Sequence, residues 1–318
     1  MRVSSNSFST DLRLQMSKLA ERQARLQQQI STGQRITTAS DDPKAMRRVL
    51  DLRNERSQLT QYQDNIATLR ENANVVYSTV NAMKRLSDRA SEIATMADGT
   101  KAPVALSAYA KEVDQLLEET LRLSNTQYRD VYIFSGTKSK DATYTASRDS
   151  DEKITAVSFD GNSNSAKIDI ALSTSVDGNY SAEGAKGILK NSANDADFIT
   201  NLIALRDNLA TAADTSLAKD ANHTALTNIK DTVLGNLNKD EVNFIDHFSS
   251  IGATLSRLET SEAITKSQVA SIEPLVSNEA DVDLADSLVR LNEIQNAYTA
   301  ALQSGGMLMK TSLLDYIR

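Results

Sequence analysis

Residues Asn65–Gly99, NIATLRENANVVYSTVNAMKRLSDRASEIATMADG, decide the fold class of this chain. Apolar or small residues recur through this stretch and the residues just before it at alternating intervals of three and four, a pattern typical of a long amphipathic helix that packs against other helices. The series comprises Leu59, Tyr62, Ile66, Leu69, Ala73, Val76, Val80, Met83, Ser87, Ala90 and Ala94. At about 1.5 Å per residue, a helix from Ala45 to Ala97 would be roughly 80 Å long. The sequence therefore predicts a helical rod.

Further helices are predicted on the C-terminal side of this segment. Asp98-Gly99 and Pro103 end the long helix, and the next helix would carry one apolar face. That face comprises Tyr109, Val113, Leu116, Thr120 and Leu123. Helical spacing returns after residue 190, and a second long helix runs from Phe244 until Pro274 breaks or kinks it. Long helices with short connections favour antiparallel packing.

Both ends of the chain carry the same spacing in a narrower stripe, in which polar residues such as Gln23 and Gln295 interrupt the apolar ones. A lone helix with such a stripe is only marginally stable in water, so each end needs a partner helix. We therefore predict that the ends form an assembly interface. Its residues are Leu12, Met16, Leu19, Leu26 and Ile30 near the N-terminus, and Leu284, Leu288, Leu291, Tyr298 and Leu302 near the C-terminus.

A break separates the first helix from the long one. Gly33 follows the last apolar position of the first helix, as a helix-ending glycine does. Asp42 is well placed to cap the next helix, and Pro43 suits its first turn, where a missing N–H costs nothing. The pair Asp41-Asp42 could also act as two acids, but the proline that follows favours capping.

Residues 138–190 differ in composition from the rest, because Ser, Thr, Asp, Asn and Gly are frequent there. Apolar and polar residues alternate over 154–159 and 166–170, with the turn-forming Asp160-Gly161 between them. We predict a small β-rich insert. The fold class is therefore mainly α, with long antiparallel helices, terminal coiled-coil helices and this insert.

Composition excludes several functions. The 318 residues contain no cysteine, so disulfides, thiolate metal sites and cysteine nucleophiles are excluded. The two histidines, His223 and His247, have no ligand partners at metal-binding spacing. A net charge of −7 argues against nucleic-acid binding, and no apolar run approaches the length of a membrane span. We expect no catalytic residue, cofactor or metal, and neither nucleic acid nor membrane as a partner.

Charge is distributed unevenly along the chain. Residues 1–56 carry 11 Lys and Arg against 6 Asp and Glu, whereas residues 274–318 carry 3 against 6. The basic start and the acidic end are electrostatic complements. This suggests that the two ends meet, either in one chain or between chains.

Several motifs together resemble the bacterial flagellin family. Gln29–Ile36 and Ser40–Pro43 resemble its N-terminal signature, in which a Ser-Gly-type turn ends one helix and an Asp-Asp pair opens the next. Arg129–Gly136 resembles the Tyr-Ile-Phe-Ser/Ala-Gly motif of the members that join hook to filament, and Gln303–Arg318 resembles their C-terminus. The likeness covers residues 1–137 and 240–318 and excludes the insert. Asp-Asp-Pro, where flagellins commonly have Asp-Asp-Ala, favours the junction members.

The resemblance implies an architecture and a function. Residues 1–42 with 278–318 would form an inner coiled-coil layer, 43–137 with 191–277 a long-helix rod domain, and 138–190 an outer insert. The hinge between inner and outer layers would comprise Gly33, Asp42 and Pro43. The family also implies a non-enzymatic subunit in a closed ring of about eleven copies. That ring would contact an adjacent hook-associated protein and flagellin.

The same resemblance implies where the protein acts. Family members bind a flagellar export chaperone and leave the cell through the flagellar type III secretion channel without a cleaved signal. They function in the extracellular part of the bacterial flagellum. Two alternatives remain open from the sequence, namely a flagellin that forms the filament and a cytosolic coiled-coil scaffold. An enzyme hidden in the insert is a third and weaker alternative.

Overall fold

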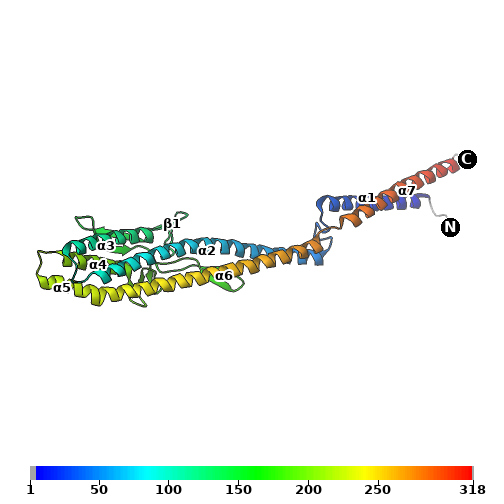
Figure 1. Cartoon of the computed structure of the whole chain (residues 1–318). Helices are drawn as coiled ribbons and strands as arrows, with labels where there is room; N and C mark the ends of the chain where they lie inside the picture. Colours follow the sequence, from blue (N-terminus) through cyan, green and yellow to red (C-terminus); the bar gives the residue numbers. More distant parts are fainter. Residues whose placement is uncertain (1–4, 317–318) are drawn as a thin grey trace. The chain divides into compact units, whose positions relative to one another are not determined.

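The computed structural model describes the backbone of residues 5–316 and the side chains of residues 10–307. The chain divides into two compact units, one within residues 1–59 and 267–318 and the other formed by residues 60–266. Helices dominate both units, and the strands lie between residues 127 and 197 (Figure 1). The predicted class, mainly α with a small β-rich part, is confirmed.

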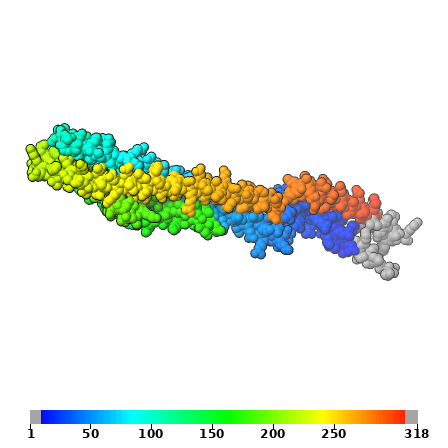
Figure 2. All heavy atoms as spheres, turned by 60° about the horizontal axis from the view of Figure 1, so that its bottom comes forward, coloured from blue at the N-terminus to red at the C-terminus, as the bar shows by residue number. Residues whose placement is uncertain are grey.

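The 60–266 unit is built on the two longest helices. These helices are α2 (Pro43–Met96) and α6 (Leu234–Ala280), and α3 (Pro103–Ser124), α4 (Phe198–Ala213), α5 (Lys219–Asn228) and the π-helical turn η1 (Ile229–Val233) accompany them. The predicted stripe of α2 is buried from Ile66 to Ala94, with no member more than 4% exposed, whereas Leu59 and Tyr62 are half-buried. Within this unit, α6 runs along one face beside the β-rich segment (Figure 2). The stripe of α2 is thus a core seam.

Two helix predictions need correction. The buried face of α3 comprises Leu106, Ala110, Val113, Leu117, Thr120 and Ser124. It shares Val113 and Thr120 with the predicted face but is rotated from it, because α3 also packs against α4. Helix α6 does not end at Pro274 but continues to Ala280. Ile272 and Ala280 are buried and anchor this last part of the helix. Pro274 has no backbone N–H to donate within the helix, but it lies on the exposed side, where water replaces that hydrogen bond.

The strands form small, separate sheets. Their bounds are β1 Gln127–Tyr128, β2 Val131–Tyr132, β3 Tyr144–Arg148, β4 Ile154–Phe159, β5 Lys167–Ala171, β6 Thr174–Asp177, β7 Glu183–Gly184, β8 Lys190–Asn191 and β9 Ala196–Asp197. Antiparallel hairpins join β1 to β2, β3 to β4 and β5 to β6. Strand β8 pairs in parallel with β7 and antiparallel with β9.

The strand positions confirm the predicted alternation, and Asp160-Gly161 lies between β4 and β5 as expected, but these two strands do not pair with each other. Strand β4 pairs backward with β3 through a turn in which the Asp149 carboxylate accepts the amides of Asp151 and Lys153, both at 2.9 Å. Gly161 instead packs tightly, since a Cβ there would lie 2.8 Å from the Phe159 ring and 2.9 Å from Ser135 Cα. Gly161 is therefore needed for close packing against Phe159 and Ser135.

The β-rich insert shares the core of the helices. Tyr144, Ile154, Ile188 and Leu189 belong to the buried cluster that also contains residues of α2, α3, α4 and α6. The insert therefore belongs to the compact 60–266 unit, and the division into inner layer, rod domain and outer insert stays a prediction. The insert is a cover on the helical core.

Candidate assembly interface

Helices α1 (Ser5–Thr32) and α7 (Leu284–Tyr316) pack against each other in the unit that holds both ends of the chain. They are antiparallel, because Leu12 near the start of α1 meets Gly305 near the end of α7 (Figure 1). A Cβ on Gly305 would lie 2.6 Å from Leu12 Cδ2, so the glycine permits close approach of the helices. At the opposite end of the pair, Gln34 forms an isolated antiparallel bridge with Asp281.

The predicted interface residues occupy different positions on the two helices. In α1, Leu12, Met16, Leu19, Leu26 and Ile30 are all half-buried. In α7, Leu291 and Tyr298 are half-buried, and they belong to a less exposed stripe that also contains Ser287, Ile294, Ala301 and Gly305. Side chains of Leu26 and Ile294 line one shallow pocket between the helices. The structure thus brings Leu291 and Tyr298 onto the face toward α1.

The other predicted residues of α7 are more exposed than Leu291 and Tyr298. Leu284, Leu288 and Leu302 are 51%, 49% and 48% exposed, and neighbouring Val289 is 58% exposed. We call Leu284, Leu288 and Leu302 the outer stripe of α7, because the helical repeat places them within about 40° of one another around the axis. Exposed apolar residues that gather on one surface mark a site of association. The α7 stripe expected from sequence therefore has a part that α1 covers, with Leu291 and Tyr298, and an exposed part beside it, with Leu284, Leu288 and Leu302.

The connection from α1 to α2 is organised by two adjacent carboxylates. Asp41 Oδ2 accepts the amides of Thr37 at 3.1 Å and Thr38 at 3.0 Å, and its Oδ1 accepts Arg25 Nη2 at 2.8 Å. These backbone donors lower the pKa of Asp41 to about 2. Asp42 Oδ1 accepts the Lys44 and Ala45 amides at 3.2 and 3.0 Å, which confirms the predicted cap of α2 at Pro43. We refer to residues 33–43 as the elbow.

The elbow is tied to the segment that joins α6 to α7. Gly33 has a φ of +68°, and its carbonyl accepts the Val282 amide at 2.9 Å. The Arg35 amide donates to the Ala280 carbonyl at 2.7 Å. The two ends of the chain therefore meet through backbone bonds as well as through α1 and α7.

Sequence reasoning missed one ion-pair group in this region. The Arg48 guanidinium forms a bidentate pair with Glu279 at 2.9 and 2.8 Å, and Arg35 Nη2 donates to the Glu279 carbonyl at 2.7 Å. The Arg48 hydrogen bond lowers the pKa of the Glu279 carboxyl. The basic start and the acidic end of the sequence were the only signal for this contact, and they did not identify the partners.

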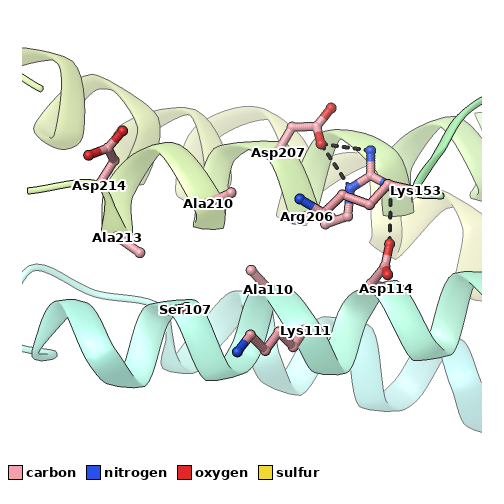
Figure 3. A pocket seen from close by; sticks show the side chains of 10 residues that line it. All are labelled: Ser107, Ala110, Lys111, Asp114, Lys153, Arg206, Asp207, Ala210, Ala213 and Asp214. Carbon is pink, nitrogen blue, oxygen red and sulfur yellow. Dashed lines mark hydrogen bonds and ion pairs between the residues drawn. The ribbon is translucent and has the colours of Figure 1, made fainter. Parts of the chain in front are cut away.

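A second candidate location lies between α3 and α4 in the other unit (Figure 3). It is a pocket of about 350 Å³ with Ala110, Ala210 and Ala213 among its lining residues. Arg206, with a side chain only 7% exposed, gives its donors to Asp114 at 3.2 Å and Asp207 at 2.8 Å. It also donates to the Ile154 carbonyl at 2.7 Å. Since the guanidinium is neutralised, it serves as a cross-link between α3, α4 and β4.

Neither unit presents an obvious reaction centre. Among the residues that the structure describes, no group of three or more His, Asp or Glu side chains could hold a metal ion. Over the same residues, every helix is too short or too polar to cross a membrane. The geometry defines a helical protein in which the two terminal helices pair and leave apolar residues of α7 exposed.

Comparison with known proteins identifies a family for the first part of the chain. Residues 3–139 match the family described as the bacterial flagellin N-terminal helical region. This match covers the first part of the chain, less than half of its length. A search among curated proteins finds no match.

Solved flagellar proteins share the fold. A putative flagellar hook-associated protein from Vibrio parahaemolyticus is 20% identical, with 76% of this chain and 100% of that chain covered and a TM-score of 0.61. FlgL from Xanthomonas campestris is 13% identical, with 70% and 98% covered and a TM-score of 0.58. The flagellar junction protein FlgL from Legionella pneumophila is 13% identical, with 73% and 99% covered and a TM-score of 0.56.

Proposed function

We propose that this chain is a structural subunit of the bacterial flagellum that joins hook to filament and assembles through α1 and α7. Its support is the flagellin N-terminal helical region, together with a fold shared with hook-associated and junction proteins. The observation that carries the proposal is the antiparallel α1–α7 pair with its outer stripe uncovered. The subunit acts by binding copies of itself and performs no reaction.

Association gains its free energy from the outer stripe. Full burial of one leucine side chain contributes about 1.5–3 kcal/mol, and the leucines of the stripe are already about half covered. Each added copy therefore contributes a modest free energy of burial at each leucine of the stripe. Only a ring or tube of neighbouring copies covers the whole stripe. This makes closed assembly of many copies more favourable than a free monomer or a dimer.

The finer parts of the proposal follow the family resemblance. The ring would hold about eleven copies with cyclic symmetry. Its neighbours would be a hook-associated protein on one side and flagellin on the other. The chain would reach this extracellular position through the flagellar export channel, escorted by an export chaperone, and the elbow would act as the hinge between inner and outer layers.

Labelling of this protein on isolated flagella tests the position. Electron microscopy should show one band at the boundary between hook and filament, and deletion of the gene should release flagellin into the medium. Label along the whole filament, or filaments grown from the purified protein alone, would establish the flagellin alternative. Stable soluble dimers that stay in the cell would establish the scaffold alternative.

Two substitutions in α7 test the interface itself. Leu291→Asp places a charge on the face toward α1, and Leu288→Asp places one on the outer stripe. Both should abolish incorporation into flagella, while circular dichroism of the purified proteins keeps its helical content near wild type. Asn292→Asp, an exposed polar position of the same helix, is the control and should assemble normally. Normal incorporation of Leu291→Asp and Leu288→Asp would refute the placement of the interface.

A further inference from the structure

The pair formed by α1 and α7 has two flanks of different character. The outer stripe lies on one side of the α7 residues that face α1. On the other side lie Asp286, Arg290 and Glu293, which are all the charged residues of α7 between Leu284 and Met307. At about 100° per residue, Arg290 lies about 160° from Leu288 around the helix axis. We call the side with Leu288 the apolar flank and the side with Arg290 the charged flank.

The charged flank contains a small pocket where the two helices meet. Its volume is about 250 Å³, below the roughly 300–1,000 Å³ of sites for small molecules, so it is of a size for one side chain. Leu26 and Ile294 are its apolar lining residues, and both are half-buried. The other lining residues are Arg22, Arg25, Gln29, Arg290 and Glu293. Because arginine side chains add methylene groups to these walls, the pocket suits an apolar side chain.

The rim of this pocket carries more positive than negative charge, since three arginines stand against one glutamate. Arg25 and Arg290 have carboxylate partners in their own chain, each at 2.8 Å. Among the described residues, Arg22 and Glu293 form no ion pair. Two copies that met through their charged flanks would bring like charges together, which costs free energy. The charged flank therefore requires a surface of a different kind.

The apolar flank offers such a surface at the same level of the pair. Leu288 is 49% exposed and lies two residues, or about 3 Å along the axis, from Arg290 in the pocket rim. Asn292 and Gln295 follow Leu288 on the same flank, and both are exposed. Their side chains are uncharged amides whose oxygens can accept hydrogen bonds from arginine. Leu288 thus has the exposure and the surroundings that the pocket suits.

The two flanks cannot meet within one chain, since they lie on opposite sides of the same helix pair. Two copies that stand side by side in the same orientation bring the apolar flank of one against the charged flank of the other. Such a head-to-tail contact joins two different surfaces and generates a ring when its rotation closes. Contact between two apolar flanks would instead give a two-fold dimer.

We propose that Leu288 of one copy inserts into the pocket at Leu26 and Ile294 of the next copy, where Arg22 donates to the amide side chains that surround the leucine. This inference rests on the proposed function and adds the direction of its contact. Every copy gives a leucine on one flank and receives one on the other. The arginines prevent the charged flank from pairing with itself, so assembly proceeds head to tail.

Disulfide cross-linking in isolated flagella tests this direction, because the chain has no cysteine of its own. One chain carries both Leu288→Cys and Gln29→Cys, replaces the wild type in the cell and is mildly oxidised after the flagella are isolated. A head-to-tail contact should give a ladder of covalent multimers that extends to the complete ring and returns to monomer on reduction. Each single variant should give no cross-link. The dilute double variant should also give none, because its two cysteines lie on opposite flanks of one pair.

A neighbouring position supplies the matched control. Val289 is 58% exposed but lies about 100° from Leu288 around the helix, so Val289→Cys with Gln29→Cys should give no ladder. Dimers formed by Leu288→Cys alone would show two-fold pairing and overturn the proposal. A labelled band at the boundary between hook and filament without a ladder would overturn it too, while the proposed function would stand. Absence of that band would instead contradict the proposed function.

A charge exchange decides the matter if the cysteine chains are not incorporated into flagella. Leu288→Lys should block incorporation, because it brings a cation to the arginine rim. Addition of Gln29→Glu to the same chain should raise incorporation by about tenfold over Leu288→Lys alone, since the new carboxylate meets the lysine of the neighbouring copy. Incorporation that stays at the level of Leu288→Lys would overturn the proposal.

Discussion

The helical stripe of α2 and that of α7 follow the same three-and-four spacing, yet they end in different surroundings. From Ile66 to Ala94 the α2 stripe is at most 4% exposed, because α3, α4, α6 and the β-rich insert surround it. In α7 the described part of the pattern is covered in part by α1, and the leucines of the outer stripe are about half exposed. A stripe becomes a core where the chain supplies enough neighbours and an interface where it does not.

Both units carry exposed ion pairs, but the 60–266 unit also buries charged and amide side chains. The elbow of the terminal unit relies on exposed pairs such as Arg48 with Glu279. The 60–266 unit buries Asp240, Asn243 and Arg206 and satisfies them with hydrogen bonds. Exposed ion pairs contribute little to stability, whereas buried polar groups are costly when a partner is lost. The terminal unit is therefore the more easily rearranged of the two.

The largest effect is expected in the core of the 60–266 unit. Phe244 is fully buried and meets Phe198 edge-on, with ring centroids 5.2 Å apart. Phe244→Ala should lower the free energy of unfolding by about 3–5 kcal/mol, because it leaves a cavity that the rigid core cannot fill. Urea unfolding followed by circular dichroism measures this change.

Val242 supplies the matched control for that substitution. It lies two residues away on the same helix but is 55% exposed. Val242→Ala should change the free energy of unfolding by less than about 0.5 kcal/mol. Equal losses in Phe244→Ala and Val242→Ala would contradict the contrast between covered and uncovered faces.

An intermediate effect is expected where α1 meets α7. Gly305→Leu would force a side chain into the space of Leu12, and overpacking of this kind costs about 1–3 kcal/mol. The pair should separate, and incorporation into flagella should fall sharply. Gly306→Leu is the control, since nothing lies within 4 Å of a Cβ at that position. If Gly305→Leu and Gly306→Leu assemble equally well, the close approach of the helices is not needed.

The smallest effect concerns the elbow in acid. The folded pKa of Asp41 is lowered to about 2 by the Thr37 and Thr38 amides, so its stabilisation is complete above its ordinary pKa and is lost as pH falls toward 2. Carboxyl NMR should find Asp41 ionised at pH 3. The Thr37 and Thr38 amides should remain protected there in the wild type and exchange rapidly in Asp41→Ala. A midpoint near pH 4 would show that these bonds are not formed in solution.

Sequence reasoning was most successful where local chemistry decides. It located α2 and its buried stripe, the cap at Asp42 with Pro43, and the strand positions over 154–159. Each of these depends on residues close together in the chain. The predicted interface of α7 was less specific, because helical spacing places Leu288 and Leu291 in one stripe. The spacing does not show that Leu291 is covered and Leu288 exposed.

The contacts that it missed join residues far apart in sequence. Glu279 pairs with Arg48 across 231 positions, and Asn243 contacts Gly187 across 56. Nothing near either residue encodes its partner. The same holds for β4, which pairs with β3 and not with β5 because the core around Phe159 and Ser135 takes up Gly161.

The amino-acid sequence by itself determined that this protein is built from long helices, that one of them begins at Pro43 after the Asp42 cap, and that its ends carry narrow apolar stripes. Those features follow from helical periodicity and capping, which act within a few residues. Only the tertiary structure decided which side of α7 stays open and how the strands pair. These depend on which distant surfaces are buried together, and burial is a property of the whole fold.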